Sequence, residues 1–152
     1  MHSILAEYLK RENVRILNSV RDWREAIEVS TRQLIEQGFI TERYPQRVLE
    51  LTVQHGSYYV VGNSTALVHA RPEDGVIRQQ LAVTVLQQPV YFDDKPTEPV
   101  HLFIPLCAES NDGHLELLKQ LAELMMDESR VKKCMDMHSE RELYSEIVGT
   151  NI

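Results

Sequence analysis

The sequence is poor in cysteine and has no long apolar run. It contains 2 cysteines, Cys107 and Cys134, in no paired-cysteine motif, so a small disulfide-stapled scaffold is excluded and reduced cytosolic thiols are expected. No uninterrupted apolar run approaches the ~18 residues of a membrane span. A secretory signal needs an apolar region near its start, and Glu7 interrupts the chain before such a region can form. Together these absences predict a cytoplasmic location.

Basic residues are scarce relative to acidic ones. Lys and Arg total 16 against 23 Asp and Glu, a formal net charge of −7. Sequence-independent binding to nucleic acid needs a basic face, so this balance argues against that class of function. It also disfavours anionic membrane surfaces. The motifs of phosphate loops, serine hydrolases and zinc proteases are absent as well.

What remains is the composition of an ordinary globular chain. Hydrophobic residues make up 43 % and charged residues 26 % of the 152 residues, which suits one domain over residues 1–152 with a full core. In the first half, Asp22 and Glu25 have the spacing of a capping box. The expected elements are a weak strand at 14–17, a helix from Asp22 to Gly38, a helix from Pro45 to Gly56, a strand at 58–61 and a short apolar segment at 66–68.

The second half predicts a hairpin followed by helices. Strands are expected at 81–92 and 100–107, joined by a seven-residue turn at 93–99. Asn111 or Asp112 begins a helix, and Ser139 with Glu142 begins the last one. The side chains expected to face the core of these two helices are Leu115, Leu118, Leu121 or Ala122, Met125, Leu143, Tyr144 and Ile147. The hairpin excludes a purely parallel sheet, so the predicted fold class is α/β (α+β layered), a mixed sheet flanked by helices.

Among the six histidines, His69 has the most informative context. It follows an apolar strand-like segment and is followed by Arg71 and a Pro- and Gly-containing exit. Imidazole is a good nucleophile near neutral pH, because its usual pKa is about 6.5. Arg71 could then offset negative charge on an incoming phosphoryl group. The alternative from spacing alone is a structural histidine that closes the strand.

The other histidines carry weaker signals. His114 lies at the first turn of a predicted helix, where backbone N–H groups favour anions, although a histidine there can equally be incidental. His55 precedes Gly56 at a helix end, where a cation can cap the helix. His101 is expected to be a half-buried structural residue of its strand. Cys134 and His138, four residues apart, are a weak metal signal on their own.

Three stretches together resemble the enzyme IIA domains of the bacterial sugar phosphotransferase system, in the mannitol/fructose branch. The ascorbate-type members of that branch are the most similar, on the stretch QHG at 54–56, the tyrosine pair Tyr58 and Tyr59, and the segment around His69. The resemblance covers essentially the whole chain. The stretches that carry it are YYVV at 58–61, ALVHARPEDGV at 66–76 and GHLELL at 113–118.

The resemblance implies an α/β layered fold and a phosphotransferase component with a phosphohistidine intermediate. His69 would accept a phosphoryl group from the phosphohistidine of the carrier protein HPr and pass it to a cysteine of a IIB component, which serves a IIC permease. His114 would line the same site and stabilise the phosphate. Arg71 and His55 would assist binding. No metal or other cofactor is implied, and the sugar, ascorbate or a related sugar acid, follows from the resemblance only.

One position departs from the family pattern, which usually has proline immediately before the active histidine. This chain has Val68. Valine adds an N–H donor that proline lacks, so a looser approach to His69 is expected. The Val68 change favours one alternative, a regulatory module of the same fold that responds to phosphorylation. A separate alternative is a non-catalytic domain with a metal at some of His55, His69, His101 and His114.

Overall fold

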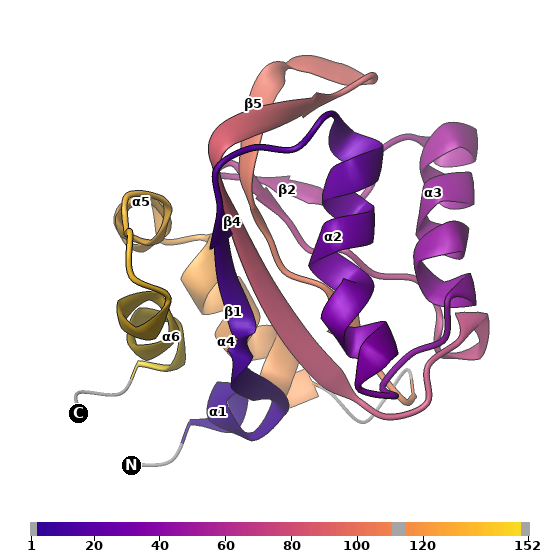
Figure 1. Cartoon of the computed structure of the whole chain (residues 1–152), viewed down its shortest axis with the longest axis horizontal. Helices are drawn as coiled ribbons and strands as arrows, with labels where there is room; N and C mark the ends of the chain where they lie inside the picture. Colours follow the sequence, from indigo (N-terminus) through magenta and orange to yellow (C-terminus); the bar gives the residue numbers. More distant parts are fainter. Residues whose placement is uncertain (1–2, 111–114, 150–152) are drawn as a thin grey trace.

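The chain forms one mixed sheet between two layers of helices (Figure 1). The computed structural model describes residues 3–110 and 115–149. Its helices are α1 (Ile4–Tyr8), α2 (Trp23–Glu36), α3 (Arg43–His55), a 3-10 turn η1 (Pro72–Asp74), α4 (Leu115–Met125), α5 (Glu128–Met135) and α6 (Glu140–Val148). Its strands are β1 (Leu9–Leu17), β2 (Val60–Gly62), β3 (Thr65–Ala66), β4 (Gln80–Phe92), β5 (Lys95–Phe103) and β6 (Leu106–Cys107). Among the described helices, none is long and apolar enough to cross a bilayer.

The strand order is β1-β4-β5-β3-β2, with β6 paired to β4. β1 runs parallel to β4, and β3 runs parallel to β5. The pairs β4–β5, β2–β3 and β4–β6 are antiparallel. The predicted mixed sheet flanked by helices is therefore confirmed.

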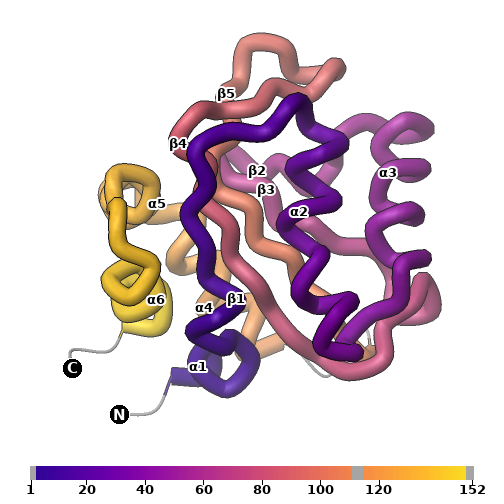
Figure 2. The backbone as a smooth tube through the Cα atoms, viewed as in Figure 1, coloured from indigo at the N-terminus to yellow at the C-terminus, as the bar shows by residue number. Residues whose placement is uncertain are grey.

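Helices cover both faces of the central strand β4, which explains its nearly continuous run of apolar residues. On one face α2 and α3 pack through Trp23, Ile27 and Val48 against the sheet. On the other face α1, α4, α5 and α6 enclose a second cluster that includes Leu121 and Leu143. Figure 2 shows the chain passing from the α2–α3 layer, through the sheet strands, to the α4–α6 layer.

The predicted hairpin exists, but its turn is much shorter than expected. Only Asp93 and Asp94 connect the strands, because Phe92 already pairs with Lys95. The prolines at 96 and 99 lie inside β5 rather than in a loop. They are tolerated there because β3 pairs with β5 only at Leu102 and Phe103, which leaves one edge of the preceding residues open.

Three other expectations need correction. The strand predicted at 58–61 begins only at Val60, and the strand predicted at 100–107 is interrupted before Leu106. Leu115, which was expected to face the core, is 79 % exposed. The α4 residues buried in the core include Leu117 and Leu124 instead. Neither α1 nor α5 was predicted; both are short helices, and each begins at a side-chain cap, Ser3 or Asp127.

The helix caps predicted at Asp22 and Ser139 are confirmed. The cap expected at Asn111 or Asp112 lies outside the described residues. The Asp22 carboxylate accepts a hydrogen bond from the Glu25 N–H, and the Ser139 hydroxyl accepts one from the Glu142 N–H. Leu143 and Ile147 are buried. Local spacing was sufficient here, because a cap is formed by residues three apart in the chain.

Candidate functional site

His69 lies where an extended segment leaves the sheet after β3. The preceding residue, Val68, is fully buried, and its N–H donates to the Ile104 carbonyl at 3.0 Å. The Val68 carbonyl in turn accepts from the Leu106 N–H at 2.9 Å. The segment is thus held by the β5–β6 connection up to the residue before His69, which is itself only half-buried.

This pairing corrects the expectation that Val68 loosens the approach to His69. The N–H that valine adds, relative to proline, has a partner in the Ile104 carbonyl. A buried N–H without a partner would destabilise the segment. With one, Val68 contributes both a hydrogen bond and an apolar side chain to the core.

The imidazole of His69 is oriented by a main-chain oxygen. Its Nδ1 lies 2.7 Å from the carbonyl oxygen of Leu67. A carbonyl oxygen only accepts, so in the neutral ring Nδ1 carries the proton and Nε2 has the lone pair. No hydrogen bond from the described residues uses Nε2. This geometry leaves the Nε2 lone pair without a hydrogen bond from the described residues.

Tyr58 contacts the same histidine from the loop between α3 and β2. Its hydroxyl donates to the His69 carbonyl at 2.6 Å. The two rings are perpendicular, with centroids 5.3 Å apart. Burial and the Asp74 carboxylate raise the pKa of Tyr58 above its usual value, although Arg47 opposes this. The phenol is therefore protonated at neutral pH and can donate.

On the other side of His69, Tyr44 of α3 holds Ala70. The Ala70 N–H donates to the Tyr44 hydroxyl at 2.9 Å, and that hydroxyl donates to the Leu106 carbonyl at 2.7 Å. Tyr44 is fully buried, and burial raises its pKa far above the usual value. His69 is therefore fixed on both sides, by the sheet before it and by α3 after it.

The loop that follows His69, residues 71–75, is held by the buried carboxylate of Asp74. Asp74 accepts a hydrogen bond from the Arg71 N–H at 3.0 Å and lies 3.4 Å from Nε of Arg47. The Arg71 side chain is exposed, and it forms no ion pair with the described residues. Arg47 and Tyr44 were missed from sequence. Their signal was a spacing of three on one helix, which places both side chains toward the His69 loop.

The other histidines named in the predictions are His55, His114 and His101. His55 is the exposed last residue of α3, eight residues and roughly 12 Å along the helix axis beyond Arg47. No described contact joins it to His69. His114 lies outside the described residues. Nδ1 of His101 donates to the Leu86 carbonyl oxygen, 2.8 Å away, in the structural role expected for it.

Metal binding and a cysteine nucleophile have little support within the described part of the chain. No three potential metal ligands among His, Cys, Asp and Glu come together there. His138 lies beyond the end of α5 and contacts Gln87. Burial raises the pKa of Cys134 to about 11 and that of Cys107 further still, so both thiols are protonated at neutral pH. Among the described residues, His69 is therefore the candidate nucleophile.

The chain matches the family described as phosphoenolpyruvate-dependent sugar phosphotransferase system, EIIA 2, over residues 7–149. The protein belongs to this EIIA family. Among curated relatives, the mannitol-specific cryptic phosphotransferase enzyme IIA component of Escherichia coli K12 is 33 % identical over 139 residues, covering 91 % of this chain and 94 % of the relative. The ascorbate-specific EIIA component of Shigella flexneri is 28 % identical, covering 99 % and 97 %.

Solved structures of EIIA proteins agree with this assignment. The solution structure of the mannitol-specific cryptic enzyme IIA CmtB from Escherichia coli superposes with a TM-score of 0.89 at 32 % identity, covering 96 % of this chain and 99 % of that one. The family recognised from the stretches around Tyr58, His69 and residue 114 is thus confirmed, and so is its fold.

Proposed function

We propose that this EIIA protein carries a phosphoryl group on Nε2 of His69. The observation that supports it most directly is the bond between Nδ1 of His69 and the Leu67 carbonyl, because it orients the imidazole and leaves the Nε2 lone pair available. Family membership gives the chemical class, phosphotransfer.

The proposed step is a transfer between two nitrogens. The Nε2 lone pair of His69 forms the new N–P bond while the N–P bond of the donor phosphohistidine breaks and its electron pair returns to the donor ring. His69 then has a phosphoryl group on Nε2 and a proton on Nδ1, so its ring becomes cationic. The Leu67 carbonyl stabilises that N–H, because a hydrogen bond to a charged donor is stronger than one to a neutral donor. The protein contributes orientation and charge stabilisation.

Donor and acceptor follow from the family. We take phospho-HPr as the donor and a cysteine of a IIB component as the acceptor, with a IIC permease served indirectly. Arg71, on the exposed side of the loop, is assigned to the phosphoryl oxygens of the incoming group. His114 and His55 are assigned to phosphate stabilisation and to binding, as the resemblance implies. The relatives named for mannitol and for ascorbate suggest a sugar or sugar acid as the transported compound.

The test is intact-mass measurement after incubation with phosphoenolpyruvate, enzyme I and HPr. We expect a gain of one acid-labile phosphoryl group, lost in His69→Ala and kept in His138→Ala, an exposed histidine far from the site in sequence. Stoichiometric labelling of folded His69→Ala would overturn the assignment. Nitrogen-15 NMR of the phosphoprotein identifies the modified nitrogen, and a phosphoryl group on Nδ1 would contradict the proposed geometry.

A further inference from the structure

Tyr58 is an unusual surface tyrosine. Its side chain is 41 % exposed, yet its hydroxyl is bonded to the main chain of His69 rather than directed only to water. Its ring lies perpendicular to the imidazole at 5.3 Å. Perpendicular ring pairs at this distance attract each other beyond the effect of the area they bury. Two different parts of Tyr58 therefore contact two different parts of His69.

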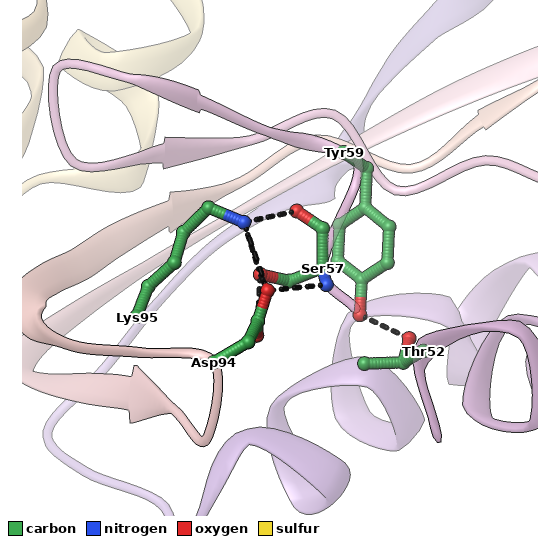
Figure 3. A network of polar contacts seen from close by, with 5 residues as sticks. All are labelled: Thr52, Ser57, Tyr59, Asp94 and Lys95. Atoms are coloured by element: carbon green, nitrogen blue, oxygen red, sulfur yellow. Dashed lines mark hydrogen bonds and ion pairs between the residues drawn. The ribbon is translucent and has the colours of Figure 1, made fainter. Parts of the chain in front are cut away.

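The residue before Tyr58 is anchored by the tip of the β4–β5 hairpin (Figure 3). Ser57 is fully buried, and its N–H and hydroxyl donate to the Asp94 carboxylate, each at 2.9 Å. The Lys95 ammonium donates to the Ser57 carbonyl at 3.0 Å and to its hydroxyl at 2.8 Å. All polar groups of Ser57 are thus held by two consecutive residues of the hairpin.

The residue after Tyr58 is anchored as well. Tyr59 is fully buried, and its hydroxyl lies 2.7 Å from that of Thr52 on α3 (Figure 3). The Thr52 hydroxyl already donates to the Val48 carbonyl, so Tyr59 is the donor to Thr52. The Tyr59 carbonyl also accepts from the N–H of Leu67, the residue whose own carbonyl holds the His69 ring.

Tyr58 consequently projects from a backbone that is fixed on both sides. A side chain on a fixed backbone loses less conformational freedom when it binds, so its contact with His69 is pre-organised. The hydroxyl bonds the main-chain carbonyl and does not occupy Nε2, which leaves the nucleophilic nitrogen open. The phenol ring lies perpendicular to the imidazole and in contact with it, and it opposes rotation of the imidazole.

We infer that Tyr58 is a positioning residue for phosphoryl transfer, which holds the His69 main chain through its hydroxyl and the imidazole through its ring. This inference rests on the proposed function of His69. Asp94 and Lys95 support it from the hairpin tip by fixing Ser57. Transfer needs Nε2 directed at phosphorus, so a less restrained imidazole spends less time in the reactive orientation.

The test uses the full chain and four variants. Tyr58→Phe removes the hydroxyl and keeps the ring, whereas Tyr58→Ala removes both. Thr31→Val on α2 is the control for loss of a buried hydroxyl, because the Thr31 hydroxyl donates to the Ile27 carbonyl and contacts neither Tyr58 nor His69. Tyr91→Phe is the control for an exposed tyrosine, 49 % accessible. We measure kcat and KM for phosphorylation by phospho-HPr, and the tautomer and exchange of the His69 imidazole by nitrogen-15 NMR.

We expect kcat to fall about tenfold in Tyr58→Phe and about a hundredfold in Tyr58→Ala, with KM changed less, since misplacement of a reacting group lowers the rate at this scale. The NMR spectra of both variants should show a mixture of His69 tautomers or faster ring exchange. Thr31→Val should lose stability but keep kcat and the Nδ1–H tautomer. If Tyr58→Ala has the kcat and the His69 spectrum of Thr31→Val, the inference is wrong.

This design separates the inference from the proposed function. If the wild-type protein gains no phosphoryl group on His69, the proposed function fails. The imidazole spectra still decide whether Tyr58 orients the ring. If wild-type His69 is phosphorylated and the Tyr58 variants match the controls in both readouts, only the positioning role fails.

Discussion

The hydroxyl of Tyr44 lies between the main chains of Ala70 and Leu106, 2.9 Å from the amide nitrogen of the first and 2.7 Å from the carbonyl oxygen of the second. One side chain of α3 thereby joins the loop that follows His69 to strand β6. The position of the candidate nucleophile depends on this bridge as well as on its own strand.

Tyr44→Phe should destabilise the protein by about 1–3 kcal/mol, because it leaves a buried N–H and a buried carbonyl without their partner. It keeps the ring, so no large cavity forms. The measurement is urea unfolding, with Tyr91→Phe as the control expected within about 0.5 kcal/mol of wild type. A Tyr44→Phe protein as stable as that control would show that the bridge contributes nothing.

Asp94 should make stability depend on acid pH. Partial burial opposes its ionisation, but hydrogen bonds from the Ser57 N–H, Lys95 and the Ser57 hydroxyl prevail and lower its pKa from 3.8 to about 2. A carboxyl with a lowered folded-state pKa stabilises the fold above its unfolded pKa, and that contribution is lost as pH falls from about 4 through about 2. Urea midpoints of wild type and Asp94→Asn should therefore differ at pH 7 and converge toward pH 2. A constant difference across this range would contradict the linkage.

We expect a side chain at position 56, in place of Gly56, to lower the free energy of unfolding. Its φ is +83° and its ψ −179°, a region occupied almost only by glycine, and an added Cβ would lie 2.8 Å from the Asp94 carboxylate oxygen. Gly38, with φ +80° and open space around it, is the matched control. We expect Gly56→Ala to cost roughly 2–4 kcal/mol and Gly38→Ala roughly 1–2 kcal/mol in thermal or urea unfolding.

A double-mutant cycle isolates the contact itself. In an Asp94→Ala background the added methyl group no longer meets the carboxylate, so Gly56→Ala should cost less there than in wild type. Equal costs in the two backgrounds would assign the whole effect to backbone strain.

Arg71→Ala should lower kcat/KM for phosphorylation by phospho-HPr about tenfold while leaving stability within about 0.5 kcal/mol of wild type. The guanidinium is exposed and forms no ion pair with the described residues, so its removal costs the fold little. Its charge acts on an anionic group that approaches His69, and that effect weakens with added salt. Arg32→Ala on α2, also exposed, is the control. Equal rates for the two variants at low salt would exclude Arg71 from the site.

Sequence patterns were sufficient where the cause is local. The caps at Asp22 and Ser139, strand β4 and the structural role of His101 were all predicted, because each depends on neighbours within one element or on alternation along a strand. The segment around His69 was found in the same way. It combines a β-favouring approach, a nucleophile and a cation within five residues.

The contacts that hold His69 could not be predicted. Tyr58 reaches it across 11 residues and Tyr44 reaches Ala70 across 26, while the hairpin tip that fixes Ser57 is 37 residues away. The two-residue turn at Asp93 and Asp94 was also missed. Composition favours a loop there, whereas pairing with β4 extends the strand through both prolines.

The sequence by itself determined the class of fold, the family and the identity of the candidate nucleophile, since these follow from local periodicity and from residues close together in the chain. The tertiary structure alone decided which nitrogen of His69 is available, how Val68 is accommodated and which tyrosines hold the loop. The nitrogen of His69 that receives no hydrogen bond from the described residues is set by the rotamer that places Nδ1 against the Leu67 carbonyl, two residues earlier. The accommodation of Val68 and the contacts of the tyrosines depend on hydrogen bonds between segments that only the packed sheet and helices bring within about 3 Å. No spacing in the sequence encodes such a distance.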